Sequence, residues 1–293
     1  RALRARKRPE TAHDMHAMDC GGRSLDLSRP RVMGVLNVTP DSFSDGGAFL
    51  AVRNAVRHAE RMVQEGADIV DVGGESTRPG AAQVSAEEEL ARVIPVVEAL
   101  AARLSVPVSI DTSKPEIMRA AVAAGAGLIN DVRALGEPGA VDAAAEVGVP
   151  VCLMHMQGQP SNMQQAPSYG DVVIDVTRFL RQRVEACLSA GIGRERILVD
   201  PGFGFGKTLA HNLALLAGLS AIGELGFPVL VGVSRKSMIG ALTGRDVDDR
   251  LAGSLAAAVL AVERGAQVVR AHDIAPTVDA LRVVDALRRG HPA

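Results

Sequence analysis

The amino-acid sequence predicts one closed (β/α)8 barrel, the TIM-barrel form of the α/β class, and three observations support this prediction. From residue 32 onward, short runs rich in β-branched residues alternate with Ala-rich helical stretches. The strand runs are apolar nearly throughout, which is typical of parallel strands that are buried on both faces. Eight such units fit into about 260 residues, a length that matches a closed barrel better than an open doubly wound sheet.

The predicted elements follow one another in strict order. Strands are expected at 32–39, 68–74, 106–112, 128–132, 151–156, 197–200, 228–233 and 268–272. Helices are expected at 51–65, 85–104, 115–124, 139–147, 172–190, 211–225, 248–264 and 276–289. Glycines directly follow many of these helical runs, as C-cap glycines do, and support their ends: Gly66, Gly125, Gly148, Gly191, Gly226 and Gly265.

The domain organisation is simple. Residues 1–17 are expected to be a disordered N-terminal extension, and residues 18–293 to be one domain. Residues 18–31 could form a short β-hairpin that closes the bottom of the barrel. A chain of 293 residues would suggest two domains by length alone, but no linker or change of composition divides it.

Composition and charge exclude several classes of protein. The chain is 47% hydrophobic and 23% charged, as globular proteins are. It has no Trp, one Tyr and six Phe, and Lys+Arg (32) nearly balances Asp+Glu (34), so a nucleic-acid partner is not expected. Its three cysteines are widely separated and fit neither a disulfide framework nor a zinc site. With no apolar run long enough for a membrane span and no secretory signal, the expected location is cytoplasmic.

Polar residues mark the end of every predicted strand. In chain order they are Asn37, the segment 73–78, Asp111, Asn130, His155 with Gln157, Asp200, Lys236, and Arg270 with His272. Because the carboxyl ends of barrel strands meet at one rim, these residues predict an active site there.

The chemistry of two groups at this rim can be read from their residue types. Asp111, Asn130 and Asp200 suit a ligand edge with several N–H donors, or Lys236 could pair with the carboxylates, since unpaired buried carboxylates are costly. Arg270 and His272 alternate on the last strand and precede a helix, which predicts an anion site. A divalent ion would be of the magnesium type, shared with substrate phosphates.

The loops after the strands carry further signals. Three of them are long, at 37–50, 73–84 and 157–171, and could act as lids, although surface decoration is the preferred interpretation of 157–171. Segment 201–208 ends in Gly-Lys-Thr like a phosphate-binding P-loop, but Pro201 stands where that motif needs Gly. Its glycines are expected instead to approach a flat ligand. His211, on a helical stretch, is expected to be solvated.

The motifs at the strand ends resemble those of the dihydropteroate synthase family from about residue 20 to 288. The similar segments are Met33–Gly47 (MGVLNVTPDSFSDGG), Asp71–Gly80 (DVGGESTRPG), Ser109–Thr112, Asn130–Val132, Leu153–Gly158, Asp200–Lys207, Ser234–Lys236 and Arg270–Asp273. Ala271 stands where the family more often has Val. Residues 18–293 would accordingly be a pterin-binding (β/α)8 barrel.

The resemblance implies condensation of 6-hydroxymethyl-7,8-dihydropterin pyrophosphate with p-aminobenzoate, in folate biosynthesis. It implies that the pterin is held by Asp111, Asn130, Asp200, Lys236 and Arg270. It implies that pyrophosphate is bound by Asn37, Thr77, Arg270 and His272, and Mg²⁺ by Asn37. It implies a p-aminobenzoate pocket, also the target of sulfonamides, formed by Phe43, Arg78, Pro79, Phe205 and Ser234. Catalytic roles would fall to Asn37, Asp41, Lys236, Arg270 and His272, in a homodimer.

Two alternatives stay open at this point. A methyltetrahydrofolate methyltransferase type of barrel would share the Asp/Asn pterin residues, but would not need Arg270, His272 and two long loops for pyrophosphate. A non-enzymatic pterin-binding relative should have lost residues such as Asp41, Phe43 or Arg78, and all three are present.

Overall fold

A computed structural model describes residues 17–38, 47–76 and 84–290 of the chain. Its centre is a closed barrel of parallel strands, in the order β10-β3-β4-β5-β6-β7-β8-β9 around the ring. The strands are β3 (Arg31–Asn37), β4 (Ile69–Gly73), β5 (Val108–Asp111), β6 (Leu128–Asp131), β7 (Val151–Met154), β8 (Ile197–Asp200), β9 (Val229–Val231) and β10 (Ala266–Ala271). The predicted (β/α)8 barrel is therefore confirmed.

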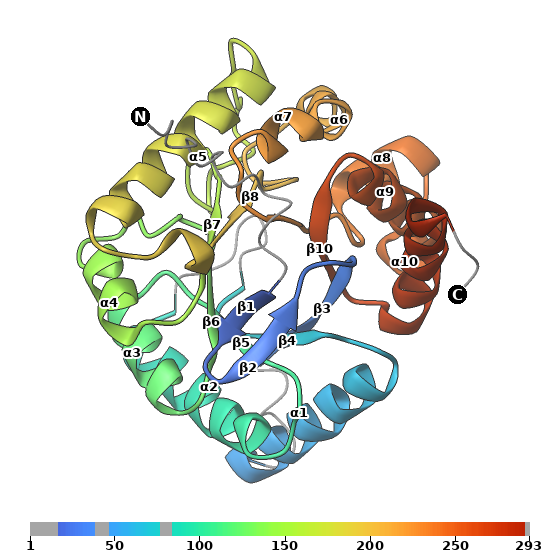
Figure 1. Cartoon of the computed structure of the whole chain (residues 1–293). Coiled ribbons are helices and arrows are strands. Elements are labelled where there is room, and N and C mark those ends of the chain that lie inside the picture. The colour runs from blue at the N-terminus through green and yellow to red at the C-terminus, as the bar shows by residue number, and fades with distance from the viewer. Residues whose placement is uncertain (1–16, 39–46, 77–83, 291–293) are drawn as a thin grey trace, which may run out of the picture.

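Helices surround the barrel on its outside, as Figure 1 shows. They are α1 (Gly47–Gln64), α2 (Ala86–Ala101), α3 (Pro115–Ala123), α4 (Ala140–Val147), α5 (Val172–Ser189), α6 (Leu209–Ala217), α7 (Leu219–Gly223), α8 (Ser237–Thr243), α9 (Leu251–Glu263) and α10 (Ile274–Arg289), with short 3-10 turns η3 (Arg194–Arg196) and η4 (Val247–Asp249). The main apolar core lies between these helices and the outward-facing strand residues. It is built almost entirely from Ala, Val, Leu and Ile, as the low aromatic content requires.

An antiparallel hairpin, β1 (Ala17–Cys20) and β2 (Arg23–Asp26), lies across the barrel in Figure 1. Its apolar side chains join the lowest layer of barrel residues in one buried cluster: Met18, Cys20, Leu25, Leu27, Met33, Ile69, Leu128, Cys152, Leu198, Leu230 and Val268. The hairpin predicted within residues 18–31 is thus present and covers the amino end of the barrel. It begins at Ala17, one residue before the predicted boundary.

The barrel interior changes from apolar to polar along its axis. Because side chains alternate along a strand, the residue two positions after each apolar floor residue also faces inward. On several strands that residue is polar: Asp71 follows Ile69, Asn130 follows Leu128, Asp200 follows Leu198 and Arg270 follows Val268. The carboxyl half of the barrel is therefore a polar layer on an apolar floor.

Some helix predictions differ from the structure. The helix expected at 211–225 is two helices, α6 and α7, with Gly218 between them. Helix α8 was not predicted, because its seven residues contain a glycine and end at the left-handed C-cap Gly244. The helix predicted at 248–264 is α9, which begins at Leu251, directly after the short turn η4 and Arg250. The expected extension lies almost wholly outside the described residues.

None of the helices in the described segments has the combination of length and apolar character that crossing a bilayer requires.

Candidate active site

Arg270 is the central cation of the polar layer. From β10 its Nε lies 2.7 Å from Asp71 Oδ2 on β4, and its Nη2 lies 2.9 Å from Asp111 Oδ2 on β5. Asn130 on β6 donates from Nδ2 to the same Asp71 oxygen at 3.0 Å. Four strands therefore contribute one connected network, in which the two ion pairs use the Nε and Nη2 nitrogens of Arg270.

Burial dominates the titration of the carboxyl groups in this layer. Burial raises the pKa of Asp111 to about 7, although the Arg270 charge opposes this and the Asp71 charge reinforces it. Burial also raises the pKa of Asp200 to about 6, against the opposing hydrogen bond from Gly202 N–H and the Lys236 charge. Near neutral pH, Asp200 is therefore mainly a carboxylate, while Asp111 is close to its titration point.

The sequence left two partners open for the buried carboxylates, a donor-rich ligand or Lys236, and for Asp111 the structure shows Arg270 in place of Lys236. The carboxylates Asp71 and Asp111 are paired with Arg270, and Lys236 Nζ instead lies 4.2 Å from the centroid of the Phe205 ring. Burial and the nearby Arg270 charge lower the pKa of Lys236 to about 8. Arg270, which the sequence predicts to bind anions, is the ion-pair partner of Asp71 and Asp111. Only β3 lies between its strand and β4 in the ring, so its long side chain reaches both carboxylates.

The turn that carries Ser234 and Lys236 has a left-handed residue at its centre. Arg235 has φ +57°, an unfavourable value for a side chain of this size. The Arg235 guanidinium donates to the two carboxylate oxygens of Asp273, at 3.0 and 2.5 Å. The backbone N–H of Arg235 donates to Ser254 Oγ at 3.0 Å. These contacts hold the strained turn and so fix the residues on both sides of it.

His272 is linked to the same turn. Its backbone N–H donates to Ser234 Oγ at 3.2 Å, and its Nδ1 lies 3.1 Å from that oxygen. Burial, together with the Arg270 and Arg235 charges, lowers the pKa of His272 to about 4. The imidazole is therefore neutral near pH 7, so Arg270 supplies the charge of the predicted anion site.

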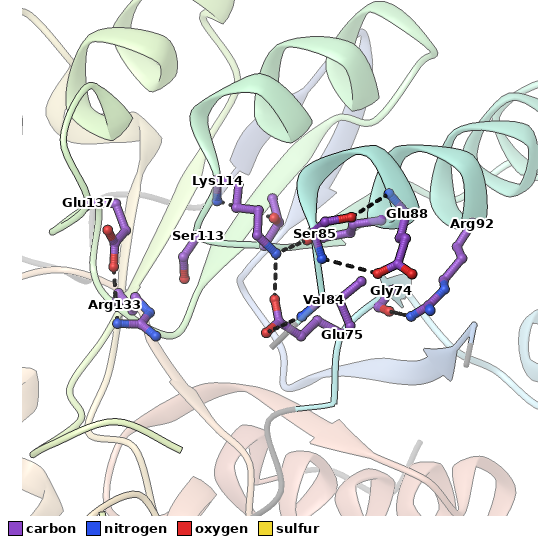
Figure 2. A network of polar contacts seen from close by, with 12 residues as sticks. Gly74, Glu75, Val84, Ser85, Glu88, Arg92, Ser113, Lys114, Arg133 and Glu137 are labelled. Carbon is purple, nitrogen blue, oxygen red and sulfur yellow. Dashed lines mark hydrogen bonds and ion pairs between the residues drawn. The ribbon is translucent and has the colours of Figure 1, made fainter. Parts of the chain in front are cut away.

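Five predicted site residues, Asp41, Phe43, Thr77, Arg78 and Pro79, lie outside the described residues. The chain on either side of 77–83 is described, and Figure 2 shows its contacts. Lys114 Nζ lies 2.6 Å from Glu75 Oε2 and 2.5 Å from Glu89 Oε2. Val84 N–H donates to Glu75 Oε1 at 3.4 Å, so one carboxylate joins both flanks.

The flanks of 77–83 have further anchors. Arg92 donates to the Gly74 carbonyl at 3.1 Å, and Ser85 with Glu88 forms a capping box that begins α2 (Figure 2). A cavity of about 400 Å³ lies beside this network, between the loops after β4, β5 and β6. Asp111 lines it together with Glu75, Lys114 and the Arg133–Glu137 ion pair.

Asn37 ends β3 at the same rim, and its side chain is exposed. In the described segments, no group of three or more His, Cys, Asp or Glu residues is arranged to hold a metal ion.

Loop 157–171 is more than surface decoration. Met163 is buried in a cluster with Val132, Met154 and Phe205. Tyr169 Oη donates to the Gly206 carbonyl at 2.7 Å, so the loop is fastened to the 201–208 turn. Its packing residues are scattered through a polar stretch, and for this reason the sequence pattern did not indicate them.

His211 is also not simply solvated. Its Nδ1 accepts a hydrogen bond from Thr208 N–H at 3.2 Å at the start of α6, and its ring packs edge-on against Tyr169.

Sequence reasoning missed two charged residues of the site region. Asp71 is a carboxylate in the middle of an apolar strand, two residues before Gly73, and this position is the signal that could have indicated it. Lys207 stands at the lysine position of a P-loop-like segment, so its pattern does not indicate a buried structural role. Both residues are almost completely buried.

Replacing Arg270 tests the central ion pairs. The substitution Arg270→Met should lower the free energy of unfolding by about 3–5 kcal/mol near pH 8, because Asp71 and Asp111 lose their partner. The loss should be smaller near pH 5, since a buried carboxyl whose folded pKa is raised destabilises the fold increasingly as pH rises through that pKa. Denaturant unfolding at both pH values measures this.

Arg282→Met is the matched control, because Arg282 forms an exposed pair with Asp279 on α10 and should change stability by less than about 0.5 kcal/mol. Equal losses in the two variants would contradict the central role of Arg270.

Comparisons with known proteins agree with this geometry. A family model described as "Pterin binding enzyme" matches residues 33–272. The dihydropteroate synthase of Escherichia coli K12 is 59% identical over 265 residues, which are 90% of this chain and 94% of that protein.

Solved structures agree as well. A Xanthomonas albilineans dihydropteroate synthase with 4-aminobenzoic acid has a TM-score of 0.88 and 59% identity, covering 93% of this chain and 98% of that one. The same organism's enzyme in complex with 7,8-dihydropteroate has a TM-score of 0.85 and 56% identity, with the same coverage. Family model, identity and fold agree over nearly the whole described chain, and the chain belongs to the dihydropteroate synthase family of pterin-binding enzymes.

Proposed function

We propose that this chain is a transferase that condenses 6-hydroxymethyl-7,8-dihydropterin pyrophosphate with p-aminobenzoate, giving 7,8-dihydropteroate and pyrophosphate in folate biosynthesis. The observation that carries the proposal is the polar layer in which Arg270, Asp71, Asp111 and Asn130 meet above the apolar floor. The Xanthomonas albilineans relatives with 4-aminobenzoic acid and with 7,8-dihydropteroate support the choice of substrates.

The pterin would be held by Asp111, Asn130, Asp200, Lys236 and Arg270. The amino-pyrimidine edge of a dihydropterin presents neighbouring N–H groups, which carboxylate and amide oxygens accept. Asn130 already donates its NH₂ to Asp71, so its carbonyl oxygen is the group left for a ligand. Lys236 would donate to the acceptor atoms of the ring, and Arg270 would lie against its face.

The pyrophosphate would be bound by Asn37, Thr77, Arg270 and His272. The N-terminus of α10 follows His272 directly, and its free N–H groups add to an anion site. Neutral His272 can donate from Nε2, since Nδ1 faces Ser234.

Mg²⁺ would be an ion shared with the substrate, with Asn37 as a protein ligand and phosphate oxygens among the other ligands. When bound, Mg²⁺ would neutralise charge on the pyrophosphate.

The reaction would proceed by departure of the leaving group followed by attack of the amine. The C–O bond to pyrophosphate breaks with both electrons on oxygen, and the ring delocalises the positive methylene. The lone pair of the arylamine then forms the C–N bond, and the nitrogen loses a proton. An arylamine needs no prior deprotonation, so Asn37, Asp41, Lys236, Arg270 and His272 would act by stabilising the leaving group and positioning the reactants.

The p-aminobenzoate pocket would be formed by Phe43, Arg78, Pro79, Phe205 and Ser234. Phe205 is nearly buried beneath Lys236, and Ser234 lies beside His272. Sulfonamides, which share the p-aminophenyl group, would compete for this pocket.

A homodimer is part of the proposal. Val283 and Leu287 lie one turn apart on α10 and are 63% and 77% exposed, and Leu260 is exposed on the neighbouring α9. Exposed apolar side chains that share a helix face favour a protein contact.

We also propose a cytoplasmic location, which the three buried free cysteines support, since disulfides are rare there.

Product formation tests the activity. Purified protein should release pyrophosphate only when dihydropterin pyrophosphate, p-aminobenzoate and Mg²⁺ are all present, and EDTA should abolish release. Release that does not depend on p-aminobenzoate would reject the synthase. Pterin binding without any release would favour the non-enzymatic alternative.

Lys236→Ala tests the pterin site. The loss of a charged donor should weaken dihydropterin binding about 10- to 100-fold in calorimetry. Arg119→Ala on α3, which removes an exposed ion pair with Glu146, is the control and should leave the affinity unchanged. Unchanged affinity in Lys236→Ala would remove this residue from the site.

The double substitution Val283→Glu/Leu287→Glu tests the dimer. Light scattering after size exclusion should show a dimer for the parent chain and a monomer for this variant. Leu188→Glu, at an exposed apolar position on α5, should remain dimeric. A monomeric parent chain would reject the dimer.

A further inference from the structure

The turn at 201–206 approaches the chain after β7 so closely that only glycine fits. Gly202 has φ +69°, and a Cβ there would lie 1.9 Å from the His155 carbonyl oxygen. Gly206 has φ +62°, and a Cβ there would lie 2.3 Å from the Gln157 carbonyl oxygen. Gly202 and Gly206 therefore serve backbone-to-backbone packing between two neighbouring loops, whereas Gly204 faces the Lys236 side chain.

The lysine of this segment points inward. Lys207 is only 3% exposed. Its Nζ donates to the carbonyls of Gly202 and Phe205 at 2.9 and 3.0 Å, and lies 2.9 Å from His155 Nδ1. The His155 carbonyl lies further away, at 3.5 Å. The three shorter contacts match the three N–H groups of one ammonium, and two of them are in the turn itself.

His155 acts as an acceptor in this arrangement. Burial, and then the Lys207 charge, lower the pKa of His155 to about 3, so its ring is neutral. Burial lowers the pKa of Lys207 to about 7. In its protonated form Lys207 can only donate, so His155 Nδ1 then carries the lone pair and Nε2 the proton. The ring is held edge-on against Phe179, with centroids 4.9 Å apart.

The turn connects Lys207 to the polar layer. Gly202, whose carbonyl accepts from Lys207, donates its own N–H to Asp200 Oδ1 at 2.7 Å. Phe205, whose carbonyl also accepts from Lys207, places its ring under Lys236. Asp200, proposed to bind the pterin, and Phe205, proposed to line the p-aminobenzoate pocket, are therefore both linked to the Lys207 side chain through this turn.

Charge balance gives this ammonium a second role. The layer holds three carboxylates, Asp71, Asp111 and Asp200, against Arg270 and Lys236. Burial lowers the pKa of Lys207 to about 7, against the opposing Asp200 charge, and in its protonated form Lys207 is a third cation that moderates the cost of burying Asp200.

We propose that Lys207, with His155 as its acceptor, is a positioning residue of the synthase reaction: the pair holds the 201–206 turn and thereby places Phe205 and Asp200 against the substrates. This inference rests on the proposed function. Neither residue touches the substrates. Their effect passes through the turn.

Steady-state kinetics of substituted enzymes test the proposal. Lys207→Met, which keeps the length of the side chain but removes its donors, should raise the KM for p-aminobenzoate about tenfold or more, because a small displacement of the turn misplaces Phe205. The kcat should change less than about threefold. His155→Leu should show the same pattern, whereas His155→Asn, which keeps an acceptor, should restore KM to within about threefold of the parent value.

Arg194→Met is the matched control. Arg194 also donates to a turn carbonyl, that of Gly226 at 2.7 Å, and lies over the Phe227 ring, but at the opposite end of β8. It should lose thermal stability to a degree similar to Lys207→Met and keep both kinetic constants. If Arg194→Met raised KM equally, or if Lys207→Met left KM unchanged, the positioning role would be rejected.

A second measurement needs no activity. Tyr169 is the single tyrosine of a chain without tryptophan, and it donates to Gly206 in this turn. Acrylamide quenching of its fluorescence should increase in Lys207→Met and stay at the parent level in Arg194→Met. Equal quenching in all three proteins would overturn the proposal. A parent enzyme that released no pyrophosphate would instead reject the proposed function, and the quenching would still decide whether Lys207 holds the turn.

Discussion

The interior of this barrel depends on the pairing of one guanidinium, that of Arg270, with two buried carboxylates, Asp71 and Asp111. Its strand closes the ring beside β3, and its guanidinium spans to two carboxylates on β4 and β5. Buried carboxylates without a partner cost several kcal/mol each, so a polar layer of this composition requires a cation at its centre. Asp71 in turn orients the Asn130 amide, and thus one ion pair determines which atoms of several strands face a ligand.

Outside the layer, cations hold backbone turns rather than carboxylates alone. Arg235 adopts a left-handed backbone with its side chain on Asp273, and Lys207 is bonded to two carbonyls of the turn that it ends. Lys114 joins two carboxylates beside 77–83 (Figure 2). Loops are the least rigid parts of a barrel, and bonds of this kind limit their freedom where side chains must be placed within a fraction of an ångström.

The barrel could be predicted because strand and helix periods alternate without interruption and helices end at glycines. Asp111, Asn130, Asp200 and Arg270 could be placed at one rim because parallel strands share a direction. The ion pairs among these residues could not be predicted, since they depend on which strands become neighbours when the ring closes. Asp71 is harder to predict because it lies in the middle of its strand rather than at its end. Lys207 is harder to predict because its motif resembles a phosphate-binding loop, whereas its side chain binds backbone carbonyls. The division between α6 and α7 at Gly218 follows from packing that no local pattern records.

The pairing of β3 with β10 also has a consequence for how the chain matures. Asp71 and Arg270 are 199 residues apart, and the ring can close only after nearly the whole chain has been synthesised. The carboxylates of β4 and β5 therefore obtain the cation of β10 only when the last strand of the ring is in place. Closure of the barrel and neutralisation of its interior are thus one event.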